Sequence, residues 1–136
     1  MPVLVDTNVL VDLAVSDPEW AEWSRTALGQ AFNRGLVINP IVFSEFSVRY
    51  ETYDAAMDAL DLEEFHRENL LWEAAFAAGQ AFRLYRMRGG RRDKVLPDFL
   101  IGAHAVVRGY SVLTRDPAGY RTYFPGVEVI APDTHP

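Results

Sequence analysis

The sequence contains no cysteine. A disulfide framework, a cysteine-ligated zinc site and a thiol nucleophile are therefore excluded. It also lacks a run of about 18 apolar residues, the length that a membrane-spanning helix requires. Residues 1–6 lack the basic start of a signal peptide and reach an acid after few apolar residues. We therefore expect a cytoplasmic protein with no membrane partner, in which any metal is held by oxygen ligands or histidine.

The composition is that of an ordinary globular protein. Hydrophobic residues make up 49% of the 136 residues and charged residues 24%, close to the globular average. A chain of this length buries about two-thirds of the surface of its unfolded state, which is enough for a core without crosslinks. The sequence shows no internal repeat, low-complexity tract or linker. We therefore expect residues 1–136 to form a single domain.

The charge is acidic overall but unevenly distributed. The net charge is −6, which by itself argues against general binding to polyanions. One segment, 83–94, carries a net charge of +5 and contains Arg83, Arg86, Arg88, Arg91, Arg92, Lys94 and a single acid, Asp93. We call this segment the basic arm. Its charge fits a nucleic-acid contact and fits equally a solvated helix end that complements the helix dipole.

Short apolar runs alternate with helical patterns along the chain. Continuous apolar runs are typical of strands buried on both faces of a sheet, and they occur at 3–5 and 36–38. Two further strands are predicted at 110–113 and 127–130. Helical patterns begin near residue 9 and recur at 16–34, 41–50, 53–60, 68–87 and 97–109. Ser16 and Glu19 have the spacing of a capping box at the second helix start. Strands separated by helices indicate an α/β fold with a mainly parallel sheet covered on both faces.

Four acids stand near the ends of predicted strands. Asp6 follows the first strand, Glu45 lies early in the helix after the second strand, Asp98 opens a helix, and Asp116 follows strand 110–113. Because ligands bind at the carboxyl ends of parallel strands, we expect these side chains to converge. Converging carboxylates repel unless a cation bridges them, and oxygen ligands suit Mg²⁺ or Mn²⁺. Each acid alone also fits a turn, a helix cap or a solvated face, although a local role explains Asp6 least well.

Four motifs together resemble a known family. They are DTNVL at 6–10, SEF at 44–46, PDFLIGAHA at 97–105 and LTRD at 113–116. In this order and spacing they resemble the PIN-domain ribonucleases and, more narrowly, the VapC toxins of toxin–antitoxin pairs. The resemblance covers nearly the whole chain. Each motif alone is weak, and the ordered set is specific.

The resemblance carries expectations about fold, chemistry and partners. It implies a three-layer α/β/α fold, Mg²⁺- or Mn²⁺-dependent endoribonuclease activity, a homodimer and a small VapB-like antitoxin. Family roles carried over by motif assign metal binding to Asp6, Asp98 and Asp116, while Glu45 completes the catalytic set. They also assign supporting or substrate-positioning roles to two further residues, Asn8 and Thr114. With RNA as the implied substrate, we expect phosphate contacts from the arm residues Arg86, Arg88, Arg91, Arg92 and Lys94.

Three further features have a structural and a functional interpretation. Trp20 and Trp23 begin a helical stripe that suits core packing or an antitoxin groove, since tryptophan is enriched at interface hot spots. Gly102 lies on the same face as Asp98 and permits a close approach of either another element or a substrate. His104 is six residues from Asp98 on one helix, too far around it to share a metal readily, and we expect it to be structural.

The competing hypothesis is a non-nuclease α/β domain, either a phosphoacceptor modified on Asp6 or a small-ligand binding module. An aspartyl phosphatase typically needs a second Asp two residues after the nucleophile, where this chain has Asn8. A receiver-type switch typically needs a lysine late in the fold. The only lysine, Lys94, precedes Asp98, so the sequence favours the nuclease.

Overall fold

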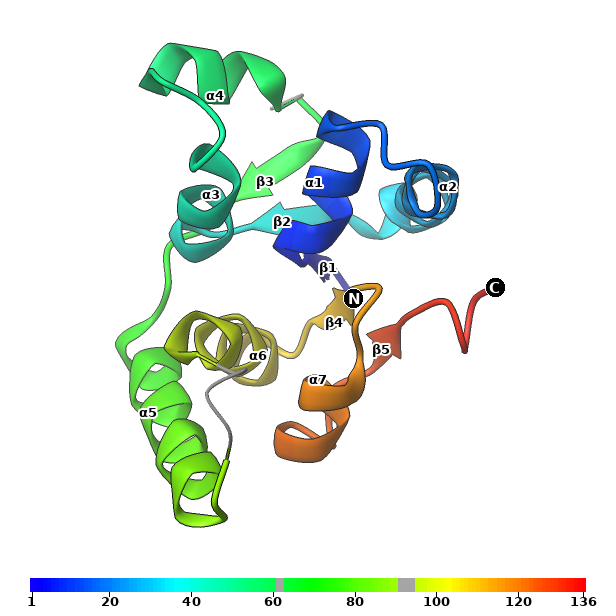
Figure 1. Ribbon diagram of the computed structural model, residues 1–136. Helices are drawn as coiled ribbons and strands as arrows, with labels where there is room; N and C mark the ends of the chain where they lie inside the picture. The colour runs from blue at the N-terminus through cyan, green and yellow to red at the C-terminus, as the bar shows by residue number, and fades with distance from the viewer. Residues whose placement is uncertain (61–62, 91–94) are drawn as a thin grey trace.

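Five short parallel strands form the central sheet of the computed structural model (Figure 1), which describes residues 1–60, 63–90 and 95–136. The strands are β1 (Val3–Val5), β2 (Leu36–Ile38), β3 (Phe65–Arg67), β4 (Ser111–Leu113) and β5 (Val129–Ile130). Their order across the sheet is β3-β2-β1-β4-β5, and every neighbouring pair is parallel. From β1 the chain builds one half of the sheet and then returns to build the other. The order therefore reverses between β1 and β4, the position where open α/β sheets bind ligands.

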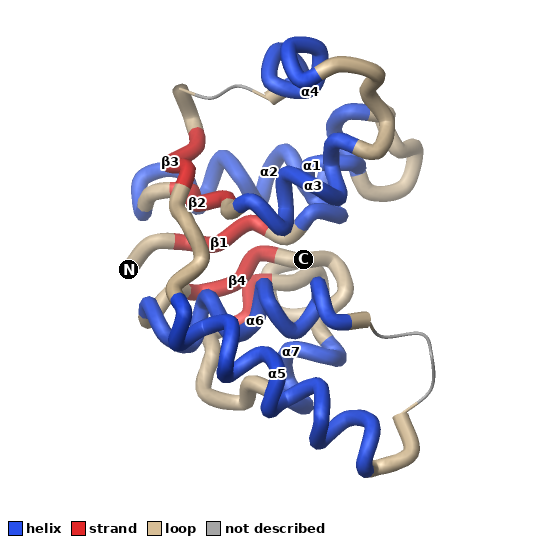
Figure 2. Tube along the Cα trace, turned by 90° about the vertical axis from the view of Figure 1, so that its left-hand side faces the viewer, coloured by secondary structure: helices blue, strands red, loops and turns tan. Residues whose placement is uncertain are grey.

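Helices cover both faces of the sheet, which confirms the predicted three-layer α/β/α fold. The first layer contains α1 (Thr7–Ala14), α2 (Ala21–Ala31), α3 (Pro40–Ser47) and α4 (Tyr53–Ala59), and the second contains α5 (Trp72–Met87), α6 (Leu96–Arg108) and α7 (Ala118–Tyr123). Figure 2 shows the two layers on opposite sides of the strands. A 3₁₀ turn, Phe32–Arg34, connects α2 to β2. No helix in the described part of the chain has the length and apolar character needed to cross a bilayer.

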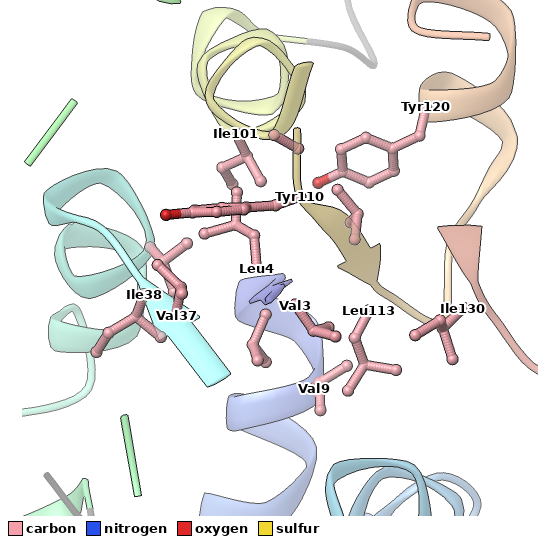
Figure 3. Close-up of a cluster of buried hydrophobic side chains, with 14 of the residues drawn as sticks. Val3, Leu4, Val9, Val37, Ile38, Ile101, Tyr110, Leu113, Tyr120 and Ile130 are labelled. Atoms are coloured by element: carbon pink, nitrogen blue, oxygen red, sulfur yellow. The ribbon is translucent and has the colours of Figure 1, made fainter. Parts of the chain in front are cut away.

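The core lies on both sides of the sheet. All three residues of β1 are fully buried, as are Ile101 and Ala103 of α6. Figure 3 shows side chains from β1, β2 and β4 packed between Ile101 of α6 and Val9 of α1. This two-sided burial explains why the strands read as continuous apolar runs rather than as alternating patterns.

The predicted start of the second helix is wrong. Ser16 is not a helix cap but has a positive φ of 51°. The side chain of Asp17 instead accepts hydrogen bonds from the backbone N–H groups of Glu19 and Trp20, at 2.9 and 2.8 Å, and α2 begins at Ala21. Asp17 therefore takes the role that the spacing assigned to Ser16, because its carboxylate reaches the free N–H groups that precede the helix.

Two elements escaped the sequence analysis. The predicted helix over 68–87 begins only at Trp72, and the strand β3 precedes it. That strand is buried at Phe65 and exposed at its other two residues, so it lacks an apolar run. Helix α7 has six residues, too few to establish a helical period. The remaining elements agree within a few residues, and the helix predicted at 41–50 is α3, capped by the Asn39 side chain.

Gly102 serves close packing between elements. A Cβ atom at this position would lie 2.3 Å from the ring of Phe124. We expect Gly102→Ala to destabilise the protein by about 2 kcal/mol, because the ring must move within a packed core. Thermal or denaturant unfolding measures this loss. The matched control is Gly79→Ala in α5, where a Cβ would meet nothing within 4 Å and helix propensity favours alanine. Equal stabilities for the two variants would contradict the packing role.

Candidate active site

The structure brings the four predicted acids to one pocket. The pocket has a volume of about 170 Å³ and is lined by Asp6, Glu45, Asp98 and Asp116 together with Thr7, Asn8, Phe99, Gly119, Tyr120, Tyr123 and Phe124. These residues come from both helical layers and from the turns after β1 and β4. The pocket therefore lies where the strand order reverses, as the parallel-sheet argument requires.

Strand pairing places Asp6 and Asp116 at the same edge. Val5 is paired with Leu113 across β1 and β4, and the backbone N–H of Asp6 donates to the carbonyl of Leu113 at 2.9 Å. Strands β1 and β4 therefore end at the same edge of the sheet. Asp6 also caps α1, since its Oδ1 accepts from the backbone N–H of Thr7 at 2.7 Å.

Asp98 reaches the pocket from the first turn of α6. Its Oδ2 accepts a hydrogen bond from the backbone N–H of Val95 at 3.2 Å. A carboxylate here both satisfies a free N–H group and complements the positive end of the helix dipole. Asp98 can therefore stabilise the start of α6 and line the pocket at the same time.

Asp6 accepts hydrogen bonds from four different residues. Its Oδ2 accepts from the Thr114 hydroxyl at 2.8 Å, the Tyr120 hydroxyl at 2.9 Å and the Asn8 amide at 3.4 Å. Burial raises the pKa of Asp6 from 3.8 to about 6, although the bonds from Thr114 and Tyr120 oppose the shift and Glu45 adds to it. Burial and the nearby Asp6 charge also raise the pKa of Tyr120 well above its ordinary value, so the phenol remains a donor.

Thr114 links Asp6 to the Asp116 turn. Its hydroxyl, fully buried, accepts from the backbone N–H of Asp116 at 3.0 Å and from the Asn8 amide at 3.1 Å while donating to Asp6. The carbonyl of the Asn8 side chain accepts from the backbone N–H of Arg115 at 3.3 Å. Asn8 and Thr114, predicted as supporting residues, thus lie in one hydrogen-bond network with two of the acids.

Two residues whose hydroxyls bond to the acids, Thr7 and Tyr120, were not singled out by the sequence analysis. The hydroxyl of Thr7 donates to Oε1 of Glu45 at 2.8 Å and so orients that acid. The position of Thr7 between Asp6 and Asn8 was the sequence signal that could have identified it as part of the site. Tyr120 had no such signal, because its helix was not predicted.

A partly buried ion pair holds the turn that carries Asp116. Asp12 of α1 is 1% exposed and accepts from Nε of Arg115 at 2.8 Å and from the Ser24 hydroxyl at 3.2 Å. The Arg115 guanidinium also lies over the ring of Trp20, 5.8 Å from its centroid. The side chain next to Asp116 is therefore anchored to α1 and to the residue that directly precedes α2.

The Trp20–Trp23 stripe is partly occupied by other parts of this chain. The two rings meet edge to face at 6.5 Å, and Nε1 of Trp23 donates to the backbone carbonyl of His135 at 2.7 Å. Trp20 is covered in part by Arg115, as described above. This surface has internal contacts of its own, which favours the packing interpretation.

His104 is structural, as expected. It is 1% exposed, and its Nε2 lies 3.0 Å from Oε1 of Glu68. Its Nδ1 lies 3.0 Å from the amide nitrogen of Asn39, whose Oδ1 is taken by the backbone N–H of Val42. That amide is therefore placed to donate to Nδ1, while Nε2 faces the Glu68 carboxylate. His104 does not line the acidic pocket.

The donors around the pocket suit a hard divalent cation. The four predicted acids that line the pocket are all carboxylates. Carboxylate oxygens are the ligands that Mg²⁺ and Mn²⁺ prefer. Among the described residues, however, no three acidic or histidine side chains lie close enough together to hold an ion directly. Mg²⁺ usually keeps several waters and binds through one or two carboxylates. The residues thus fit a partly hydrated cation.

The basic arm is only partly described. Arg83 and Arg86 lie on α5, and Arg88 follows it directly. The guanidinium of Arg86 lies 6.0 Å from the ring centroid of Phe82. Arg91, Arg92 and Lys94 fall outside the described residues. The arm ends just before α6, whose first turn carries Asp98.

The raised pKa of Asp6 makes a prediction about stability in metal-free buffer. Between the unfolded pKa of 3.8 and the folded value of about 6, the folded state holds the extra proton, so its stability falls as pH rises through this range. Asp6→Asn removes this dependence. We expect the stability of the variant relative to the wild type to rise by about 2 kcal/mol between pH 4 and 7. The NH₂ group of the asparagine, which must face the Thr7 N–H, lowers the stability of the variant equally at every pH and does not change this rise. Denaturant unfolding in EDTA tests this, and a difference that is constant with pH would contradict it.

Comparison with known proteins adds a family match and structural likenesses. The family model of the PIN domain matches residues 3–125, whereas no curated protein matches by sequence. VapBC2 from Rickettsia felis, solved with a promoter DNA fragment, is 17% identical, with a TM-score of 0.76 over 96% of this chain and 98% of that one. FitAcB from Neisseria gonorrhoeae is 19% identical, with a TM-score of 0.73 over 98% and 99%. A toxin–antitoxin complex from Klebsiella pneumoniae is 25% identical, with a TM-score of 0.71 over 96% and 97%.

Proposed function

The chain belongs to the PIN-domain family, and from that premise we propose that it is a metal-dependent endoribonuclease that acts as the toxin of a type II toxin–antitoxin pair. The family match agrees with the motif-based prediction, and the structural neighbours are VapBC and other toxin–antitoxin proteins. The observation that carries the proposal is the convergence of four acids, distant in sequence, on one pocket.

In this proposal Asp6, Asp98 and Asp116 hold Mg²⁺ or Mn²⁺, with at least one of the three contacts made through water, and Glu45 helps to orient the attacking water. When bound, the cation supplies activation of water and stabilises charge on the phosphodiester. The chain's own residues keep the ligands in place. Thr114 joins Asp6 to the Asp116 turn, and the Thr7 hydroxyl fixes one oxygen of Glu45.

The basic arm is proposed to bind the RNA backbone. Arginine forms charge-assisted and often bidentate bonds with phosphate. The arm residues Arg86, Arg88, Arg91, Arg92 and Lys94 directly precede in sequence the helix that carries Asp98, which supports a role in holding RNA for cleavage. The net charge of the whole chain is acidic, which makes this local positive charge the natural place for a polyanion to dock.

A small VapB-like antitoxin is the proposed partner, and the toxin is proposed to form a homodimer. The structural neighbours include VapBC and toxin–antitoxin complexes, which supports such a partner. An acidic pocket can be silenced by a cationic side chain that competes with the metal. We expect an antitoxin arginine to do this by pairing with two of the carboxylates.

The test is a cleavage assay with purified protein on total RNA in Mg²⁺, in Mn²⁺ and in EDTA, with the cut ends mapped by sequencing. We expect discrete cuts with either ion and none in EDTA. Absence of metal-dependent cleavage across total RNA from the native host would contradict the nuclease. A stable phosphoryl group on Asp6 after incubation with a small phosphodonor would instead favour the competing phosphoacceptor.

A further inference from the structure

The two carboxylate oxygens of Asp6 have different surroundings. Oδ2 accepts the hydroxyls of Thr114 and Tyr120 at 2.8 and 2.9 Å, with the Asn8 amide further away at 3.4 Å. Oδ1 accepts the backbone N–H of Thr7 at 2.7 Å. Each carboxylate oxygen has two lone-pair sites. The two hydroxyls therefore fill Oδ2, whereas Oδ1 keeps one site for a further ligand.

Tyr120 reaches Asp6 from a separate element. It lies in α7, four residues after Asp116, and is 7% exposed. Its backbone carbonyl accepts from the N–H of Phe124 at 2.8 Å, and the Phe124 ring fills the space beside Gly102 described above. The position of Tyr120 is thus supported by its burial and by the backbone of α7, and not only by its hydroxyl. The hydroxyl can then act as a fixed donor to Asp6.

We propose that Tyr120 is a positioning residue of the acidic pocket: together with Thr114, its hydroxyl occupies Oδ2 of Asp6 and so leaves Oδ1 as the oxygen that binds the divalent cation. The inference rests on the proposed metal-dependent function. It adds a residue that the motifs do not contain, and it assigns the metal contact to one atom.

The assignment has a physical consequence for the free protein. A carboxylate without fixed donors rotates about its Cβ–Cγ bond and presents either oxygen. The Thr114 hydroxyl, directly after β4, and the Tyr120 hydroxyl, on α7, both bind Oδ2. They therefore prevent this rotation before the cation binds. The hydrogen-bond partners of metal ligands generally act in this way, and their loss typically weakens metal affinity by about 10–100-fold.

The decisive variant is Tyr120→Phe, which removes the hydroxyl and keeps the ring. We expect its affinity for Mn²⁺, measured by calorimetric titration or by the electron spin resonance of free Mn²⁺, to fall about tenfold. In cleavage assays the half-saturating Mn²⁺ concentration should rise by the same factor. The kcat at saturating Mn²⁺ and the KM for RNA should stay near the wild-type values, because the ligand itself is still present.

The matched control is Tyr123→Phe on the same helix. The Tyr123 ring packs edge-on against Tyr85 and Phe99, at centroid distances of 5.7 and 5.3 Å, and its hydroxyl makes none of the hydrogen bonds to the acids recorded in the described part of the chain. Like Tyr120→Phe, this variant removes a tyrosine hydroxyl beside the acidic pocket. We expect it to bind Mn²⁺ as the wild type does.

A second pair of variants covers a failure of Tyr120→Phe to fold, which unfolding in EDTA would reveal. Thr114→Ser keeps the other hydroxyl and should bind Mn²⁺ normally, whereas Thr114→Val removes it and should bind at least about tenfold more weakly. Equal Mn²⁺ affinity in the wild type and folded Tyr120→Phe overturns the positioning role but leaves the proposed nuclease intact. A wild type that binds no Mn²⁺ overturns both.

Discussion

Asp6→Asn is expected to abolish metal-dependent RNA cleavage while the protein stays folded. Asparagine has nearly the same shape, and its carbonyl can still accept the Thr114 and Tyr120 hydroxyls, but it lacks the negative charge that attracts the cation. Removing a hydrogen-bond partner of a metal ligand lowers metal affinity or activity by up to about 100-fold. Removing the ligand itself should lower activity by more than this. We therefore expect kcat/KM to fall by more than about 100-fold, measured on a defined RNA that the wild type cuts.

The same variant should lose the thermal stabilisation given by divalent ions. Bound metal stabilises only the folded state, so Mg²⁺ or Mn²⁺ should raise the Tm of the wild type. Asp58→Asn is a suitable control, because Asp58 is an exposed acid on α4 that does not line the pocket. It should keep both cleavage and the Tm shift. Asp98→Asn should behave like Asp6→Asn, and equal shifts in all four proteins would refute a shared metal site.

Growth provides an independent readout of the same change. If the protein is a toxin, expression of the wild type without its antitoxin should arrest growth of the native host, and Asp6→Asn should not. Both proteins should accumulate to similar levels, which immunoblotting can verify. Harmless accumulation of folded wild type in that host would count against the toxin function.

The sequence was sufficient to predict the layers of the fold, because the principal strands are buried on both sides. Val3–Val5 and Leu36–Ile38 are apolar at every position, and such runs between helical patterns are typical of parallel sheets. Edge strand β3 was missed for the converse reason. It has one buried residue in three, and its pairing with β2 depends on tertiary contacts that no local pattern encodes.

Two acids of the site were predictable because strand topology alone brings them together. Asp6 and Asp116 follow neighbouring parallel strands, so their convergence needs no knowledge of side-chain packing. Tyr120 and the Asp12–Arg115 pair were not predictable, because each joins elements whose relative position is set by packing of the whole domain. A tyrosine on a six-residue helix and an acid within α1 carry no signal of their own. Residues that orient the site are therefore harder to find from sequence than those proposed to carry its charge.

Reversing the charge of the basic arm should separate RNA binding from metal binding. We expect Arg91→Glu combined with Arg92→Glu to weaken RNA binding by about 100-fold at physiological salt, because two cations that release counterions from phosphate become anions. The dependence of log K on log salt should become shallower by about 1.4, since each phosphate contact on a single strand contributes about 0.7. Binding titrations of RNA at several salt concentrations, in EDTA to prevent cleavage, measure both quantities.

The control for total charge is Arg25→Glu combined with Arg49→Glu. Arg25 is exposed on α2 and Arg49 is exposed after α3, so both belong to the other helical layer, and the change in net charge is the same. If the position of the charges matters rather than the net charge, only the arm variant should lose RNA affinity. The arm variant should also keep the Mn²⁺-induced Tm shift, because the four acids are untouched, whereas Asp6→Asn should lose that shift and still bind RNA. An unchanged salt dependence in the arm variant would leave the arm as a solvated helix end whose arginines complement the dipole of α5.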